Sequence, residues 1–296
     1  MSTVPEREGF SLRPTAQLRR RKLIGKAVEA SMLAAALAAV AVLALVVASV
    51  AQRGHSALTV DFFTKIPAGF GETGGGIAPA IVGSIVIVGF ATAFALPAGV
   101  LVAIYTSELA PPSFRRYVGL VLDVLNGVPA IVIGIFVYGL LIIGRQQSAL
   151  AASVALAIIM LPLVARSTQE VLALVPNSLR EASQALGVSR WRTVLGVILP
   201  ASLGGILTGA TLAVARAAGE TAPLLFTSSL ATSVVSWDPH TALQSLPLTI
   251  FQYLESPNPD DHARALAAAL VLMSFVLVIS VLSKAVLART RRKLSR

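Results

Sequence analysis

The chain has 296 residues, of which 55% are hydrophobic and only 13% are charged, and its mean hydropathy is +0.80. Soluble domains carry about a quarter charged residues, so this composition excludes an ordinary soluble domain and predicts a membrane protein. The net charge of +10 suggests nucleic acid as one partner class, but its distribution along the chain favours membrane topology, and the absence of cysteine excludes disulfides.

The apolar runs predict an all-α polytopic membrane protein with six transmembrane helices. A basic tail over residues 1–26 precedes a transmembrane domain over residues 27–288, and a second basic tail follows over residues 289–296. Asp123 would be costly in lipid, which predicts an interfacial helix over residues 117–125. The six spans are predicted at residues 31–51, 77–105, 127–143, 149–164, 203–226 and 265–287.

The distribution of Lys and Arg predicts the orientation of these spans. Nineteen of the 24 lie in the N-terminal tail, in the second and fourth loops and in the stretch from Lys284 onward, whereas the first, third and fifth loops hold four and Arg216 lies within a span. The positive-inside rule therefore places both termini and the fourth loop in the cytoplasm.

The fourth loop contains a polar stretch, the 176–200 segment, that predicts two short helices joined by a glycine turn. Ser178 and Glu181 have capping-box spacing, and Gly187 can take the left-handed conformation that closes a helix. Ser189 offers a second cap.

The end of this segment, Leu199-Pro200, predicts a break before the next span. A DNA-binding helix-turn-helix shares the glycine turn, but both flanks lead into runs long enough to span a bilayer. An ordinary cytoplasmic loop stays open as an alternative.

The spacing E-A-S-x3-G-x9-V-x-L-P in this segment resembles the EAA loop of bacterial ABC-transporter permeases. In that family the loop carries a coupling helix that docks into a groove on the cytoplasmic ATPase. Recognition of a short amphipathic helix by a groove makes physical sense of this role. The resemblance implies that coupling residues here are Glu181, Ala182, Ser183, Gly187, Leu199 and Pro200.

Arg216 and Glu220 lie four residues apart, on one face of the fifth predicted span. Arg216 falls about thirteen residues into that span, roughly 20 Å deep, where an unpaired charge is expensive. A guanidinium suits phosphate because its planar fork donates two hydrogen bonds and keeps its proton. A pathway for an anion is therefore favoured, and a structural ion pair between helices stays open.

Residues beside this pair offer further candidates. Thr221 could donate to a phosphate oxygen, although a Thr in a span usually bonds its own backbone. Gly219 and Pro223 weaken helical bonding, either for close packing and a kink or for a hinge where a path opens. Asp123 and Asn126, which precede the third span, are expected to cap a helix or lie at the interface.

The Gly-Glu-Thr-Ala-Pro run within residues 215–227 and the Gly-Val-Pro-Ala run within residues 127–136 resemble the PstA family of permeases from bacterial phosphate ABC importers. The resemblance covers nearly the whole chain. It implies a type I ABC importer (MetI-like) fold and a non-catalytic subunit of the bacterial inner membrane that forms half of a path for inorganic phosphate.

The same resemblance implies the partners. They are a PstC-like second permease, a PstB-like ATPase dimer that binds ATP-Mg, and a PstS-like phosphate-binding protein. This chain has no Walker lysine motif and no histidines at ligand spacing, so no cofactor or metal of its own is expected. A permease for another oxyanion such as sulfate or molybdate, a permease for a cationic or neutral solute, and a phosphate-sensing membrane scaffold stay open.

Overall fold

The computed structural model describes residues 16–68, 74–229 and 234–294. The described residues form helices and short connections, with an isolated bridge between Pro67 and Gly75 and no longer strand. The all-α prediction is confirmed. The chain divides into two compact units, Met1–Gln52 and Arg53–Arg296. The described part of the first unit belongs to α1 (Ala16–Gly54), and the second unit holds the other helices and the core.

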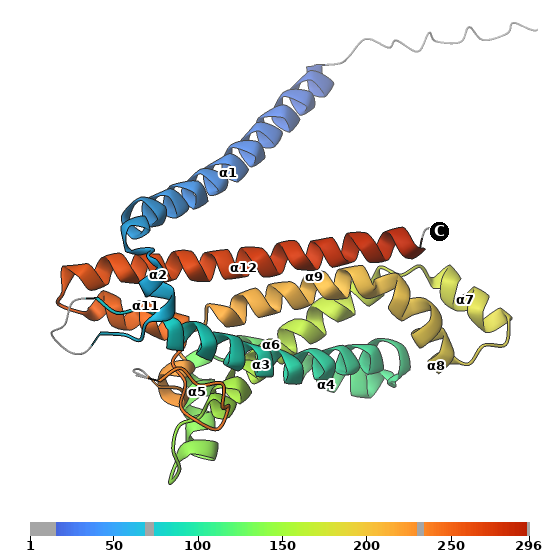
Figure 1. The fold of residues 1–296 in the computed structure, drawn as a ribbon. Coiled ribbons are helices and arrows are strands. Elements are labelled where there is room, and N and C mark those ends of the chain that lie inside the picture. Colours follow the sequence, from blue (N-terminus) through green and yellow to red (C-terminus); the bar gives the residue numbers. More distant parts are fainter. Residues whose placement is uncertain (1–15, 69–73, 230–233, 295–296) are drawn as a thin grey trace, which may run out of the picture. The chain divides into compact units, whose positions relative to one another are not determined.

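Four short helical turns interrupt or extend the longer helices. One is the 3-10 turn η1 (His55–Ala57), and three are π-helical: η2 (Tyr105–Leu109), η3 (Tyr138–Ile142) and η4 (Val194–Ile198). The α-helices after α1, shown in Figure 1, are α2 (Val60–Thr64), α3 (Ala78–Ile104), α4 (Pro112–Gly127), α5 (Ala130–Val137), α6 (Ala149–Ala173), α7 (Asn177–Ala185), α8 (Arg190–Thr193), α9 (Leu199–Ala218), α10 (Leu224–Thr227), α11 (Leu246–Glu255) and α12 (Pro259–Leu294).

Five helical stretches of the described chain are long and apolar enough to cross a membrane, and α4 with α5 makes a sixth if the two form one broken span. The bend between α4 and α5 is 97°. The predicted interfacial helix over residues 117–125 corresponds to α4, which is longer than expected at both ends. The predicted third span is the shorter α5 with η3.

Two predicted span ends are wrong. The fourth span was predicted to end at residue 164, whereas α6 continues to Ala173, past Arg166, which pairs with Asp123 of α4. The helix predicted over residues 203–226 is helical from Arg190 and ends at Ala218. Residues 219–223 separate it from α10, a point that matters for the candidate site.

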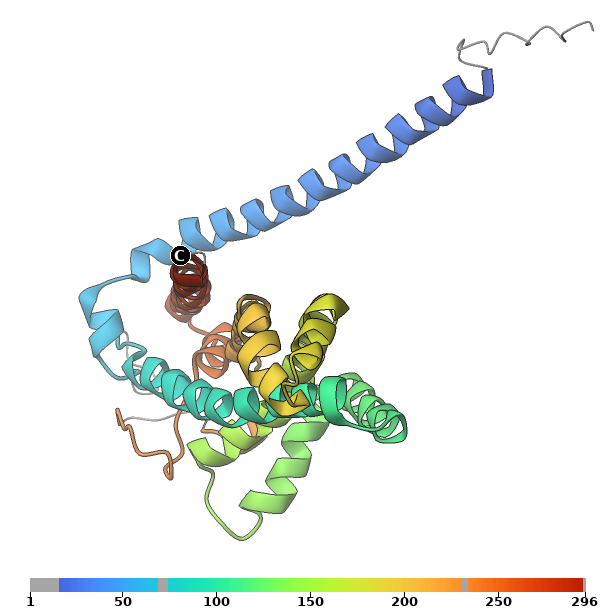
Figure 2. The same ribbon diagram turned by 90° about the vertical axis from the view of Figure 1, so that its right-hand side faces the viewer.

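The second unit is built from neighbouring helices in the spatial order α3, α6, α9 and α12 (Figures 1 and 2). Its main cluster of buried side chains joins α3, α6, α9 and α11 through Ile87, Leu156, Met160, Ala213 and Leu248. Association of helices in lipid depends on close packing and not on water exclusion, so small residues at the contacts are expected.

Two glycines of α9 allow it to pack closely against α6. A Cβ at Gly205 would lie 2.5 Å from Val171 Cγ1, and one at Gly209 would lie 2.4 Å from Ser167 Oγ. These two glycines are four residues apart on α9 and face residues four apart on α6, which is the small-xxx-small arrangement of packed membrane helices. No larger residue fits this contact without separating the helices.

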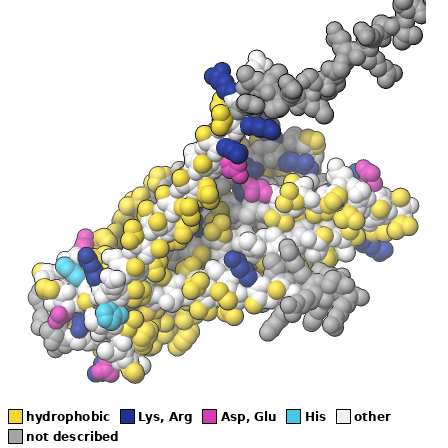
Figure 3. All heavy atoms as spheres, turned by 90° about the horizontal axis from the view of Figure 1, so that it is seen from above, with side chains coloured by type: hydrophobic (Ala, Val, Ile, Leu, Met, Phe, Trp, Pro, Cys, Tyr) yellow, Lys and Arg dark blue, Asp and Glu magenta, His cyan; other side chains and the backbone are white. Residues whose placement is uncertain are grey.

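The outer surface of the long helices is apolar. Large hydrophobic side chains such as Leu101, Leu212 and Leu277 are exposed on α3, α9 and α12. Figure 3 shows hydrophobic side chains over most of the visible face with few charged groups among them. A surface of this kind needs lipid as its solvent, so the chain is a multi-pass membrane protein.

Candidate functional site

The first candidate region is the 176–200 segment, and its helix begins differently from the prediction. Pro176 is the N-cap of α7, and no side chain caps this end. The predicted capping box of Ser178 and Glu181 is therefore wrong: Ser178 already lies inside the helix. The fixed φ of proline, here −58°, sets the chain direction into α7 without a capping side chain.

The glycine turn is confirmed. Gly187 has φ +75°, its N–H donates to Gln184 O over 2.9 Å, and Val188 N–H donates to Ser183 O over 3.2 Å. This pair of bonds is the Schellman motif, in which a left-handed residue satisfies the last free carbonyls of a helix.

Ser183 and Thr193 connect α7 to α8. Both side chains are buried, and their hydroxyls are 2.8 Å apart. Ser189 occupies the predicted N-cap position of α8, but its hydroxyl caps nothing and its carbonyl accepts from Thr193 Oγ1. The serine that replaces the second alanine of the EAA pattern thus has a partner of its own.

No break occurs at Leu199-Pro200, so this prediction is wrong. The π-helical turn η4 leads directly into α9, with Leu199 N–H donating to Val194 O. Pro200 lies in the first turn of α9, where a missing N–H costs least. The segment therefore joins a single helical stretch that runs from Arg190 to Ala218.

The 176–200 segment is polar in sequence, but several of its large apolar side chains are exposed. Leu179, Leu186 and Trp191 are exposed, with Leu186 at 83%. Glu181 and Ala182 are exposed beside them on α7. Exposed apolar residues on a short amphipathic helix and on the turn and helix that follow it are typical of a surface that docks into a partner's groove.

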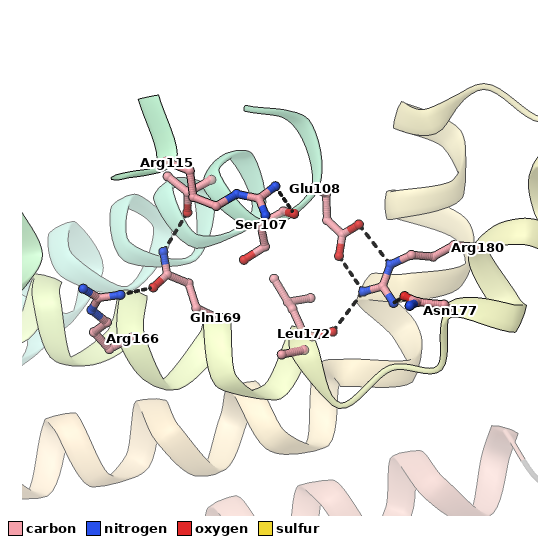
Figure 4. Close-up of a pocket in the computed structure, with 10 residues that line it drawn as sticks. Ser107, Glu108, Arg115, Arg166, Gln169, Leu172, Asn177 and Arg180 are labelled. Atoms are coloured by element: carbon pink, nitrogen blue, oxygen red, sulfur yellow. Dashed lines mark hydrogen bonds and ion pairs between the residues drawn. The ribbon is translucent and has the colours of Figure 1, made fainter. Parts of the chain in front are cut away.

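The segment is attached to the rest of the chain by Arg180 (Figure 4). Its guanidinium donates to both oxygens of Glu108, Nη2 to Oε1 over 2.7 Å and Nε to Oε2 over 3.2 Å. It also donates to the carbonyls of Val175 and Leu172 over 2.6 and 3.0 Å. The Arg180 side chain is 20% exposed and that of Glu108 only 10%, and their hydrogen bond raises the pKa of Arg180 above its ordinary value.

Sequence reasoning did not find this pair. The available signals were an arginine directly before Glu181 and an acid, Glu108, at the end of the second apolar run. Nothing in a pattern of local spacing connects residues that are 72 positions apart.

A cavity of about 500 Å³ lies beside the pair, between η2, α4, α6 and α7. Gln169 Nε2 donates to Thr106 Oγ1 over 2.7 Å, and Arg115 Nη2 donates to Ser107 O over 3.0 Å (Figure 4). The residues that line the cavity are Thr106, Ser107, Glu108, Arg115, Arg166, Gln169, Leu172, Ala173, Asn177 and Arg180.

Asp123 forms an ion pair beside this cavity, whereas it was expected to cap a helix or to lie at the membrane interface. One oxygen of its carboxylate lies 2.5 Å from Arg166 Nη2, which also donates to Gly119 O over 2.7 Å. The pair connects α4 to α6, and it compensates the charge of Arg166 within its helix.

The second candidate region is the connection between α9 and α10. Arg216 lies in the last turn of α9, because the helix ends two residues later. Its Nε is 3.5 Å from Glu220 Oε1. The Arg216 side chain is 63% exposed, whereas that of Glu220 is 20% exposed.

The predicted hinge residues flank this pair at the ends of the two helices. Gly219 is the C-cap of α9 with φ −95°, and an added Cβ there would meet nothing closer than 3.6 Å, so neither space nor conformation requires glycine. Pro223 is the N-cap of α10. Thr221 is half-buried, and its carbonyl accepts from the N–H groups of Leu224 and Leu225. A broken helix is thus present, while movement at it stays a prediction.

Two helix breaks meet at Arg216. A cavity of about 50 Å³ is lined by the Arg216–Glu220 pair and by residues on both sides of the bend between α4 and α5: Leu125, Asn126, Val128, Ala130 and Ile133, with Ile159 and Leu163 of α6. The breaks are packed closely, since a Cβ at Gly134 of α5 would lie 2.6 Å from Pro223 Cα. Asn126, expected to be a cap or an interfacial residue, lines the cavity with the charged pair.

Comparison with known proteins places this arrangement in a family. The model of the binding-protein-dependent transport system inner membrane component matches residues 95–292. The phosphate transport system permease protein PstA of Haemophilus influenzae is 40% identical over 234 residues, covering 78% of this chain and 82% of that protein. PstA of Yersinia pestis is 38% identical over 245 residues, covering 82% and 83%.

Solved structures agree on the fold. A chain of the MetNI methionine ABC transporter in an inward-facing conformation superposes with a TM-score of 0.58 at 20% identity, covering 72% of this chain and 94% of that one. A bacterial ABC transporter involved in alginate import gives a TM-score of 0.53 at 13% identity, covering 72% and 79%. The predicted ABC importer permease fold is confirmed.

Proposed function

The chain belongs to the family of binding-protein-dependent transport system inner membrane components, and on this premise we propose that it is the permease subunit of an ATP-driven importer of inorganic phosphate. Relatives between 37% and 40% identical are named as PstA permeases of phosphate transport systems. A permease subunit forms part of a path and leaves ATP hydrolysis to a partner.

The placement of Arg216 carries the proposal for the substrate. Its side chain is mostly exposed and has one distant ionic partner, so most of its N–H groups are available to a ligand. It lies where two helices are broken, and unwound backbone beside a charge is typical of substrate sites in transporters. A guanidinium there can bind phosphate with two charge-assisted hydrogen bonds.

Glu220 and Thr221 complete the proposed site in different ways. The carboxylate of Glu220 offsets part of the charge of Arg216, which limits how tightly an anion is held. Release requires such a limit, because a path must bind its substrate weakly enough to pass it on. The hydroxyl of Thr221 is a further donor beside them.

The 176–200 segment is proposed to couple this path to the ATPase. Its exposed Leu179, Leu186 and Trp191 supply the apolar surface, and Glu181, Ala182 and Gly187 hold the EAA positions. Closure of a PstB-like ATPase dimer would move the segment and with it α6 and α9. A PstC-like permease would supply the other half of the path, and a PstS-like protein would deliver phosphate from the far side. Both termini and the segment would then lie in the cytoplasm, as the positive-inside rule predicts.

Uptake by the reconstituted transporter tests the proposal. Vesicles with this chain, the second permease, the ATPase and the binding protein are expected to accumulate labelled phosphate when ATP is supplied, and excess sulfate or molybdate should not compete. Uptake should fall at least about tenfold in an Arg216→Ala variant that still assembles, as the loss of a charged hydrogen bond predicts. Lys284→Ala, which removes an exposed cation of α12, is the matched control.

The other outcomes have clear meanings. Wild-type uptake by Arg216→Ala would remove Arg216 from the path. Competition by sulfate or molybdate would identify a different oxyanion as substrate. Absence of any uptake with all four components present would favour a phosphate-sensing scaffold.

A further inference from the structure

The helix α7 has few side chains that can determine its position. It is nine residues long, and Ser183 is its one buried residue. A helix with so little buried apolar surface is positioned by polar contacts. In the described chain these are the Ser183–Thr193 bond and the bonds of Arg180.

These two contacts reach different parts of the molecule. Thr193 lies ten residues after Ser183, so their bond acts within the 176–200 segment. The carbonyls of Leu172 and Val175 that accept from Arg180 belong to the end of α6 and the connection just before α7. Glu108, in contrast, lies 72 residues away at the end of the second span.

Glu108 is brought to Arg180 by a π-helical turn. It lies in η2, where Ala110 N–H donates to Tyr105 O. The extra residue of such a turn rotates the following side chains by about 100° relative to an uninterrupted α-helix. Thr106 in the same turn accepts from Gln169 of α6, so η2 is bound to α6 as well as to α7 (Figure 4).

The Arg180–Glu108 pair has a well-defined geometry. The guanidinium meets the carboxylate at two points, which fixes orientation as well as distance. Both side chains are largely excluded from solvent, so the attraction is little screened by salt. The hydrogen bonds to the two backbone carbonyls hold the Arg180 side chain in place independently of Glu108.

We propose that Glu108 is a positioning residue for transport, which through Arg180 makes the end of α3 move together with the 176–200 segment. The inference rests on the proposed function, because it concerns how motion imposed by an ATPase enters the permease. The segment is continuous in sequence with α6 and α9, so motion reaches these helices through the backbone. The pair adds a direct contact with the end of α3, which otherwise meets the segment only through its packing on α6 and through the intervening helices.

The first test separates coupling from folding. In the reconstituted transporter, Glu108→Gln keeps the side-chain shape but replaces an acceptor by an amide that faces the guanidinium. Phosphate uptake per ATP hydrolysed should fall about tenfold, within the usual range of coupling between sites. Glu108→Asp, which keeps the charge, should restore part of it. Glu170→Gln, which removes an exposed acid from α6, is the matched control.

A purely structural role gives a different result. It would lower uptake and ATP hydrolysis together, in proportion to the amount of assembled transporter, and would leave their ratio unchanged. An unchanged ratio in assembled Glu108→Gln transporter overturns the proposal.

The second test leaves the Arg180–Glu108 pair intact and changes only two exposed residues. The chain has no cysteine, so Cys introduced at Leu101 of α3 and Ser178 of α7, both exposed, can be spin-labelled selectively. The distance between the labels should stay the same in the nucleotide-free and the ATP-vanadate-trapped complex. A change above roughly 5 Å, one turn of helix, would show that the segment moves without α3 and would overturn the proposal.

Failure of the proposed function is recognised separately. If the wild-type transporter takes up no phosphate but hydrolyses ATP, the substrate assignment fails, and the label distances still test the connection between α7 and α3.

Discussion

The two Arg–Glu pairs found among the described residues use the same side chains and are held in opposite ways. Arg180 meets Glu108 at two points, donates to two backbone carbonyls as well, and is 20% exposed. Arg216 approaches Glu220 at a single distance of 3.5 Å and is 63% exposed. The first pair joins residues that are 72 positions apart. The second joins Arg216, in the last turn of α9, to Glu220 just after that helix.

The difference teaches that the number of acceptors around a guanidinium, and not its pairing with a carboxylate, separates a structural connection from a candidate binding group. A guanidinium has five N–H donors. At Arg180 most are used by the protein, so a ligand would have to displace them. At Arg216 most are free for a ligand. The predictions below are tests of this contrast.

The largest expected effect is on the less exposed pair, Arg180 and Glu108. Removing one partner of a buried ion pair leaves an uncompensated charge and costs about 3–5 kcal/mol. Glu108→Ala should therefore lower the free energy of unfolding of the full chain in detergent micelles by about that amount, measured by denaturant titration of Trp fluorescence. A change below about 1 kcal/mol would place this pair in the same class as the exposed one.

The second prediction concerns the contact between the two helix breaks. Gly134→Ala places a Cβ 2.6 Å from Pro223 Cα, so α5 and α10 must separate, at a cost of about 1–3 kcal/mol. Phosphate uptake should fall with it, because the cavity at Arg216 would change shape. The control is Gly139→Ala in η3, where an added Cβ meets nothing within 4 Å. Equal stability and uptake of the two variants would show that the breaks need not be in contact.

The third prediction concerns the turn that closes α7. Gly187→Ala forces a side chain into the left-handed region and should destabilise the chain by about 1 kcal/mol. Gly196→Ala in η4 also meets nothing within 4 Å but has no positive φ, so it should be close to neutral. Thermal unfolding of both variants, in parallel, measures the conformational cost alone; similar midpoints would contradict the assignment of the turn.

The smallest effect is expected at the exposed pair. Glu220→Gln should change the free energy of unfolding by less than about 1 kcal/mol, as for other exposed ion pairs. Its effect should appear in transport instead, as slower release of phosphate from an Arg216 that has lost its counter-charge. Denaturant titration and uptake kinetics are measured on the same preparation; a large loss of stability would reveal a structural pair.

Local pattern was enough for part of this structure. The apolar runs predicted the helices and their class because lipid imposes one requirement on every span. Gly187 was predictable because a left-handed helix end favours glycine wherever it occurs. The prediction of a capping box at Ser178 was wrong because Pro176 is the N-cap of α7. The proline signal for a helix start therefore took precedence over the capping-box signal.

What could not be predicted depends on contacts between distant residues. The fourth span was predicted to end at residue 164, but α6 continues past Arg166, whose charge is compensated by Asp123, 43 residues away. The predicted span ran on to residue 226, although Gly219 and Pro223 were identified as residues that weaken helical bonding, because a kink or hinge within one span was expected there and not a helix end at Ala218. The π-helical turns have no sequence signal that we recognise, and Glu108, which pairs with Arg180, lies in one of them.

The glycine contact between α6 and α9 has a mechanical consequence. Gly205 and Gly209 bring the backbone of α9 close to Val171 and Ser167 of α6, so the two helices should move together. The 176–200 segment connects the end of one to the start of the other. A displacement of a few ångströms at the segment would then appear as a larger swing at the opposite end of α9, where Arg216 lies.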